Sequence, residues 1–222
     1  LCGYPEISLR FFHFCADVLS EEGFLLHKYN PDKSLASSWH PWVVGDKPQL
    51  PIQEDETALV IWSLWKHFQR YRDLEAVKPL YGRLVRKAAD FMVRYREPQT
   101  HLPAPSYDLW EERRGILAFT CAAVYAGLRA AAEFARSFGE ADNARKYDDA
   151  ASEIRAGMDA YLWRPELGRF ARMINIGFAS AKRPTKTPAS EGGHASSPSQ
   201  RNRTRRAPTC GHGITTGSPA YA

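Results

Sequence analysis

The sequence predicts an all-α domain of about five helices, followed by a disordered tail. Apolar residues recur at helical spacing in five segments of the first 176 residues, at about 6–19, 56–71, 74–96, 116–138 and 140–163. Only a few residues, near Asp73 and near Gly139, join the second helix to the third and the fourth to the fifth. Such short turns are typical of antiparallel helix pairs. The one candidate strand is a weak alternation in 168–174.

Each helix after the first has its own apolar pattern. The second carries large apolar residues three positions apart: Leu59, Trp62, Trp65 and Phe68. The third has a proline near its first turn and an apolar face: Pro79, then Leu80, Leu84, Ala88, Phe91 and Tyr95. The fourth is almost wholly apolar through Ala132, so we expect it to be buried on most sides. The fifth combines a charged face with a face that we expect to be buried: Tyr147, Ile154, Met158 and Tyr161.

The composition indicates a globular protein outside the membrane. The chain has 222 residues, of which 44% are hydrophobic, enough for one domain or for part of a larger one. No run approaches the ~18 apolar residues of a membrane helix, and no signal peptide opens the chain. The four cysteines have no metal-site spacing and favour a reducing compartment: Cys2, Cys15, Cys121 and Cys210. We therefore expect a cytoplasmic protein, unless residues ahead of Leu1 include a signal peptide.

The basic charge belongs to the last part of the chain. Residues 177–222 hold seven Lys and Arg residues and one acid, Glu191, so their net charge is +6. Residues 1–176 have a net charge of −1, which gives the whole chain its net charge of +5. This part is rich in Ser, Pro, Thr, Arg and Gly and lacks apolar periodicity, which predicts a disordered tail. An out-of-frame or mis-spliced reading explains the abrupt change. The alternative is a basic arm that binds nucleic acid, since Arg203, Arg205 and Arg206 cluster there.

The order of short and long connections predicts a site at one end of the helices. If the helices alternate in direction, the long segments 20–55, 97–115 and 164–176 all fall at the same end. The first two of these segments hold the polar and aromatic residues that could form such a site: Trp39, His40, Trp42, Glu54, Asp55, Asp108, Trp110, Glu111 and Glu112.

The stretch PSYDLWEERRG, residues 105–115, suggests carbohydrate chemistry. Cleavage of a glycosidic bond needs one protonated carboxyl at the leaving oxygen and a second carboxylate across the sugar. An apolar wall and neighbouring carboxylates help a carboxyl to keep its proton, and Trp110, Asp108 and Glu112 supply both around Glu111. The plainer alternative is that these acids, like those at 54–56, mark helix starts, and that the histidines and tryptophans are packing residues. The repetition of such features at one end favours a site.

The same stretch, followed by a long apolar helix, resembles the general-acid motif of glycoside hydrolase family 15, the glucoamylases and their relatives. LPIQEDETALVIWSLWKHF resembles the family's Gln-x-Asp segment, and GYPEI, FFHFCADVLSEEGFLLHKYNPD and SSWHPW resemble bacterial or archaeal members. The resemblance covers about residues 3–176. It implies that residues 1–176 are a partial (α/α)₆ toroid, a fold of six helical hairpins with the active site at one end.

The resemblance also implies roles for individual residues. Glu111 matches the general acid of an inverting hydrolase that acts on terminal α-glucosidic bonds and needs no cofactor or metal. The implied substrate-binding residues are Glu112, Asp108, Trp110, Asp55 and, in a loop that supplies aromatic contacts in relatives, Trp39 and Trp42.

Two family motifs have no counterpart here. A Trp-x-Arg-Asp motif that grips the terminal glucose precedes GYPEI in relatives, and the Glu motif of the catalytic base comes late in the toroid. We therefore expect this chain to hydrolyse starch oligosaccharides poorly or not at all. Two alternatives stay open: a trehalase or other α-glucoside hydrolase of the same fold, and a non-enzymatic helical module that binds sugar or protein, with a nucleic-acid-binding tail.

Overall fold

The structure, a computed structural model, describes residues 3–37, 42–44 and 46–175. The predicted site residues Trp39 and His40 lie outside the described residues, as does the predicted tail, 177–222. Within the described residues, no helix combines the length and the apolar character that crossing a membrane requires.

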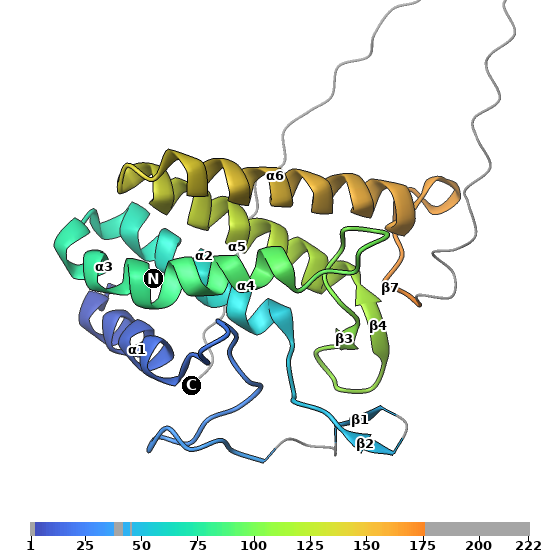
Figure 1. The fold of residues 1–222 in the computed structure, drawn as a ribbon, viewed down its shortest axis with the longest axis horizontal. Coiled ribbons are helices and arrows are strands. Elements are labelled where there is room, and N and C mark those ends of the chain that lie inside the picture. The colour runs from blue at the N-terminus through green and yellow to red at the C-terminus, as the bar shows by residue number, and fades with distance from the viewer. Residues whose placement is uncertain (1–2, 38–41, 45, 176–222) are drawn as a thin grey trace, which may run out of the picture. The chain divides into compact units, whose positions relative to one another are not determined.

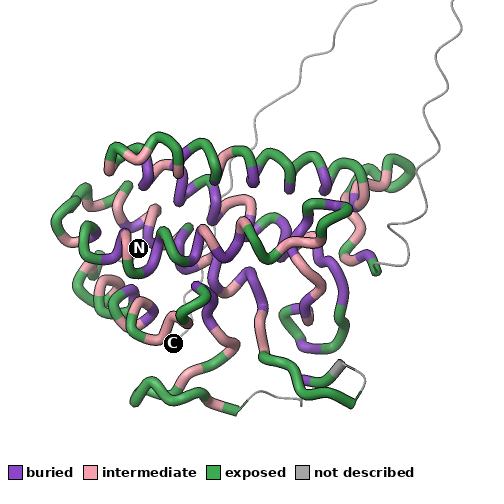
Figure 2. Tube along the Cα trace, viewed as in Figure 1, coloured by how far each residue is buried: buried purple, intermediate pink, exposed green. Residues whose placement is uncertain are grey.

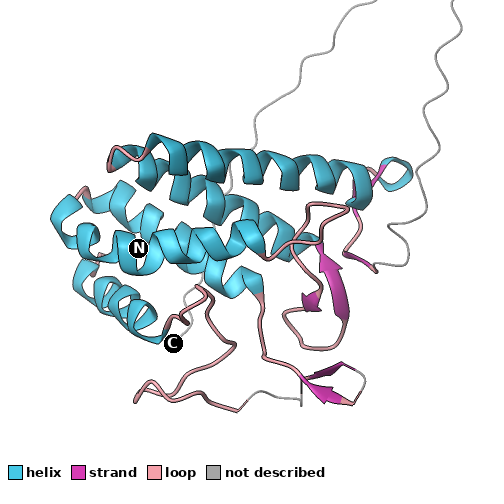
Figure 3. Cartoon of the chain, in the orientation of Figure 1, coloured by secondary structure: helices cyan, strands magenta, loops and turns pink. Residues whose placement is uncertain are grey.

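The described chain is mostly helical, which confirms the predicted all-α class (Figures 1 and 3). The α-helices are α1 (Pro5–Val18), α2 (Glu54–Tyr71), α3 (Leu74–Leu80), α4 (Lys87–Arg94), α5 (Ala118–Ser137) and α6 (Ala141–Gly157). The predicted third helix is one helical run in three parts, because a π-helical turn, Tyr81–Arg86, joins α3 to α4. This wider turn directly follows Pro79 and Leu80, where the proline cannot donate a backbone hydrogen bond. A second π-helical turn, Met158–Leu162, extends α6.

Short strands complete the fold, and most of them were not predicted. A three-stranded sheet has the order β3 (Ser106–Tyr107), β4 (Arg114–Leu117) and β7 (Met173–Ile174). Two further antiparallel pairs are β1 (Val43–Val44) with β2 (Lys47–Pro48), and β5 (Trp163–Arg164) with β6 (Arg169–Phe170). The alternation in 168–174 does correspond to strands. The predicted start of the fourth helix at Ile116 is wrong, because Ile116 pairs with Ile174 in the sheet.

Helix α5 lies at the centre of the packing, between α2 and α6. Most of its residues are buried, as expected from its nearly uniform apolar sequence. In Figure 2, the buried positions of α6 face the rest of the molecule and its outer face is exposed. The backbones of α2 and α5 approach so closely that a Cβ added at Gly127 would lie 2.9 Å from the carbonyl oxygen of Ala58. A side chain larger than hydrogen at residue 127 would push the two helices apart.

The long connections meet at one end of the helices, as predicted. In Figure 1, the β3–β4 hairpin and β7 lie at the right of the helices, whereas the turns from α2 to α3 and from α5 to α6 lie at the left. Asp108 forms an ion pair with Arg172, so the second and third long segments are in direct contact. The first long segment joins them through Gln53, whose side chain donates to the backbone of the hairpin.

Candidate active site

The WEE motif lies in the loop of the β3–β4 hairpin rather than at a helix start. Ser106 pairs with Gly115 and Tyr107 with Arg114, which leaves residues 108–113 as the connecting loop. Helix α5 begins only at Ala118, and its N-cap residue is Leu117. The alternative interpretation of these acids as caps of the following helix is therefore wrong.

Asp108 holds this loop in shape. Its Oδ1 accepts hydrogen bonds from the backbone N–H groups of Glu112, at 2.9 Å, and Arg113, at 3.3 Å, and its Oδ2 pairs with Arg172. Burial acts to raise the pKa of Asp108, but these hydrogen bonds and the Arg172 charge outweigh it, so the pKa is lowered. The ionised carboxylate of Asp108 therefore stabilises the conformation of the loop.

Glu111 occupies a conformation that is uncommon for a residue with a side chain. Its φ is 53°, and its backbone N–H donates to the carbonyl oxygen of Asp108 at 2.8 Å. The side chain is only 2% exposed, and Oε1 lies 2.7 Å from Nε2 of His27. That contact is not aligned as a ring N–H hydrogen bond, and neither carboxyl oxygen has an aligned partner among the described residues. The loop thus places a buried carboxyl in contact with the imidazole of His27 and leaves the hydrogen-bonding capacity of that carboxyl unfilled among the described residues.

Gln53 connects the hairpin to the start of α2. It is buried, and its Nε2 donates to the backbone carbonyls of Tyr107, at 3.1 Å, and Asp108, at 3.0 Å. Its Oε1 lies 3.2 Å from Nδ1 of His27. No role for Gln53 was predicted from the sequence, and His27 was considered only as a packing residue. The available signals were the place of Gln53 in the Gln-x-Asp segment and the place of His27 in a long segment at the same end.

The three acids that open α2 have different surroundings. Asp55 accepts a hydrogen bond from the hydroxyl of Thr120 at 2.8 Å, which ties α2 to α5; burial raises the pKa of Asp55 and this hydrogen bond opposes the rise. Burial raises the pKa of Glu54 to about 8, and its oxygens have no hydrogen-bond partner among the described residues. Burial also raises the pKa of Glu56, against the opposing charge of His27, whose Nδ1 lies 3.0 Å away.

The aromatic residues are arranged differently from what the resemblance implies. Trp110 is 80% exposed and lines a hollow of about 310 Å³ together with Asp108, while Glu111 does not line this hollow. Trp42 is buried, with its ring edge-on to Tyr107 at 4.8 Å between centroids and 6.2 Å from the His27 ring. Glu112 is exposed. Of the predicted tryptophans that the structure describes, Trp42 is thus the one whose ring packs near His27.

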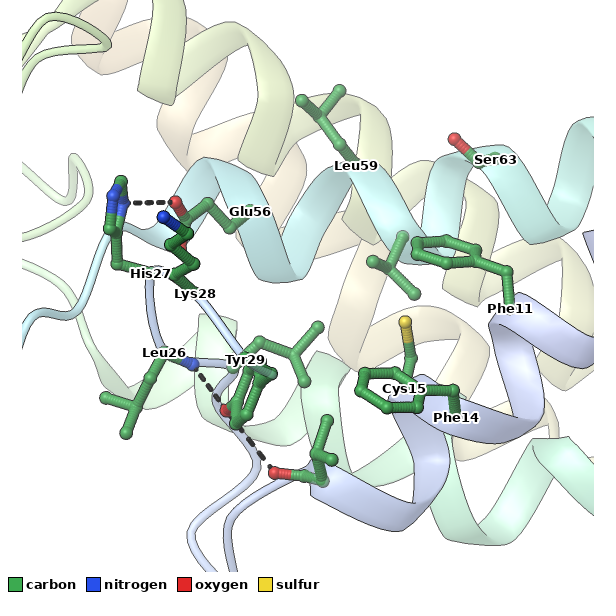
Figure 4. Close-up of a pocket in the computed structure, with 13 residues that line it drawn as sticks. Phe11, Phe14, Cys15, Leu26, His27, Lys28, Tyr29, Glu56, Leu59 and Ser63 are labelled. Atoms are coloured by element: carbon green, nitrogen blue, oxygen red, sulfur yellow. Dashed lines mark hydrogen bonds and ion pairs between the residues drawn. The ribbon is translucent and has the colours of Figure 1, made fainter. Parts of the chain in front are cut away.

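A second hollow, of about 480 Å³, lies between α1, α2 and the loop that carries His27. Figure 4 shows His27 and Glu56 at one end of it, joined by their ion pair, and Phe11 and Phe14 toward the other end. Most of its lining is apolar, which suits hydrocarbon better than sugar hydroxyls. Among the described residues, no group of three or more His, Cys, Asp or Glu side chains is arranged to hold a metal ion.

Comparison with known proteins agrees with the resemblance. The sequence model of the glycosyl hydrolases family 15 matches residues 28–178. A protein of Methanocaldococcus jannaschii described as an uncharacterized glycosyl hydrolase is 27% identical over 176 residues, which make up 79% of this chain and 26% of that relative. The chain therefore spans about a quarter of the length of the relative that it matches.

Proposed function

The chain belongs to glycosyl hydrolase family 15, and on this premise we propose that it carries the general-acid side of an α-glucosidase site, with Glu111 as the acid. The reaction is hydrolysis of terminal α-glucosidic bonds in starch-type or related oligosaccharides, with inversion at the anomeric carbon. In this reaction the acid gives its proton to the leaving oxygen, while a water activated by a second carboxylate attacks from the opposite face.

The observation that carries the proposal is the state of Glu111. The carboxyl is buried, held at a left-handed backbone position and in contact with His27, yet Oε2 has no hydrogen-bond partner among the described residues. A buried and unsatisfied carboxyl is costly unless it keeps a proton or a ligand completes its hydrogen bonds. A glycosidic oxygen that accepts a hydrogen bond from the protonated carboxyl of Glu111 meets this need.

The base is proposed to lie in another part of the whole protein. The neighbouring carboxylates are already engaged, since Asp55 bonds to Thr120, Asp108 shapes the loop and Glu56 faces the other nitrogen of His27. In inverting enzymes the base stands across the sugar, roughly 6.5–9.5 Å from the acid, so that a water fits between them. We accordingly expect the 222-residue chain to release little or no glucose from maltotriose in plain buffer.

Azide can act as the nucleophile without a catalytic base, so it allows the role of the proposed acid to be measured. Azide attacks C1 from the face opposite the leaving group, the C1–O bond breaks, and Glu111 protonates the departing maltose. We expect maltotriose and sodium azide to give β-glucosyl azide and maltose with the purified chain, measured by NMR. Because general acids contribute about 10²–10⁴ in rate, Glu111→Gln should reduce product formation by about that factor.

The exposed Glu21 provides the matched control, since Glu21→Gln changes the same functional group at a position with no proposed role and should leave the rate unchanged. The same reaction with trehalose in place of maltotriose tests the alternative that the site belongs to a trehalase. Absence of the azide product with both sugars, or a rate that does not respond to Glu111→Gln, would contradict the proposed function.

A further inference from the structure

The ring of His27 lies between two carboxyl groups from different parts of the chain. Its Nδ1 is 3.0 Å from Oε1 of Glu56 in α2, and its Nε2 is 2.7 Å from Oε1 of Glu111 in the hairpin loop. The ring is mostly buried, with 17% of its side chain exposed. His27 itself comes from the long segment between α1 and α2, so three separate segments converge on one imidazole.

The hydrogen bonds of Gln53 determine which ring nitrogen carries a hydrogen. The amide nitrogen of Gln53 donates to two backbone carbonyls of the hairpin, Tyr107 and Asp108, so its carbonyl oxygen must be the atom that faces Nδ1 at 3.2 Å. That oxygen can only accept. Because Oε1 of Glu56 also faces Nδ1, the imidazole carries a hydrogen on Nδ1.

The assignment at Nδ1 constrains the other side of the ring. A neutral imidazole with its hydrogen on Nδ1 presents a lone pair at Nε2, and an ionised Glu111 presents lone pairs as well. Two such acceptors repel each other at 2.7 Å, so a proton must reside on one of them. It is either the carboxyl proton of Glu111 or the second proton of a His27 imidazolium.

We propose that His27 is a positioning residue that holds the carboxyl of Glu111 in place and keeps one proton in common with it. The importance for catalysis rests on the proposed function, in which that proton goes to the leaving oxygen. As Glu111 loses its proton to the sugar, the His27 ring stabilises the carboxylate that forms.

The charged groups around this pair come from each element packed on it. Helix α2 contributes Asp55 and Glu56, and the hairpin contributes Glu111 and the Asp108–Arg172 pair. The His27 loop itself adds Lys28 and the phenol of Tyr29, both on the rim of the hollow shared with Glu56 (Figure 4). Acids therefore outnumber cations around the ring.

The test measures proton sharing directly in the 222-residue chain. Ring ¹⁵N shifts of His27 and the side-chain carboxyl ¹³C shift of Glu111 are followed by NMR as pH is varied. We expect Nδ1 to carry a hydrogen throughout, and the Nε2 shift of His27 and the carboxyl shift of Glu111 to change together, because the pair holds one proton between them. Glu111→Gln should change the Nε2 shift of His27, because the contacting carboxyl is lost.

A neighbouring acid serves as the control. Glu112→Gln makes the same substitution one residue away, at an exposed side chain, and should leave the Nε2 shift of His27 close to that of the wild type, because water screens this charge. Ring shifts of His27 that Glu111→Gln leaves unchanged, or a ring protonated on Nε2 alone, would overturn the proposal. The wild-type titration needs no substitution, so misfolding of a variant cannot hide the answer.

A rate measurement separates positioning from simple packing. In the azide reaction, His27→Gln keeps a polar side chain but cannot hold the shared proton, so it should lower kcat by about tenfold to hundredfold and change the pH profile while leaving KM similar. If the azide reaction fails altogether, the proposed function is rejected, but the titration still decides whether His27 and Glu111 share a proton. An unchanged pH profile in His27→Gln would contradict the positioning role.

Discussion

Replacement of Gln53 by leucine is expected to lower the free energy of unfolding by about 2–4 kcal/mol. The buried amide makes two hydrogen bonds to the backbone of the hairpin and faces Nδ1 of His27. Leucine fills similar space but leaves the carbonyl of Tyr107 without this donor, and a buried unsatisfied polar group costs about 1–3 kcal/mol. Lost packing of the hairpin on α2 adds to that cost.

The measurement is urea denaturation of the wild type and two variants. Gln69→Leu is the matched control, because it makes the same change at an exposed position within α2, the helix that Gln53 precedes, and should stay within about 0.5 kcal/mol of the wild type. Equal stability of Gln53→Leu and Gln69→Leu would show that Gln53 does not join the hairpin to α2.

Glu54→Gln is expected to stabilise the protein strongly in mildly alkaline solution and not at all in acid. Burial raises the pKa of Glu54 from 4.5 to about 8 in the folded state. The unfolded chain therefore releases this proton at a lower pH than the folded protein does, so stability is complete below about pH 4.5 and falls as pH rises toward 8. Glutamine keeps the shape without the charge and removes that loss.

The expected gain follows from the size of the shift. At 1.36 kcal/mol per pKa unit, the difference between variant and wild type should reach about 4 kcal/mol at pH 8 and vanish near pH 4. Urea denaturation at several pH values measures it, with the exposed Glu21→Gln as a control whose difference from the wild type stays small throughout. A difference for Glu54→Gln that does not change between pH 4 and pH 8 would contradict a buried, protonated Glu54.

The helices could be predicted because their signal is local. The apolar spacing of Leu59 and Trp65, for example, depends only on residues in the same helix, and the structure has α2 there. The β4–β7 pair could not be predicted, since Ile116 and Ile174 are far apart in the chain and each strand is only a few residues long. For this reason the acids at 108–112 resembled the start of a helix in the sequence, although in the structure they lie in a hairpin loop.

The candidate site was predicted in part. Counting short and long connections correctly brought the Gln53 segment and the Glu111 loop to one end of the helices, where they touch. The contact between His27 and Glu111 depends on the left-handed turn at Glu111 and on the orientation of a buried amide, and no residue spacing reveals either feature. Trp110 stands next to Glu111 in the sequence, but its side chain is exposed and the buried indole near His27 is that of Trp42.

The central proposal is that sugar binds where the start of α2, the His27 loop and the β3–β4 hairpin meet. The most direct measurement is a titration of the ¹⁵N-labelled 222-residue chain with maltotriose, followed by backbone amide shifts. We expect saturable shifts at Gly23–Tyr29, at the first turn of α2 and in residues 108–120. Shifts confined to α6 or to the apolar end of the hollow at Phe11 and Phe14, or no saturable shifts at millimolar sugar, would contradict it.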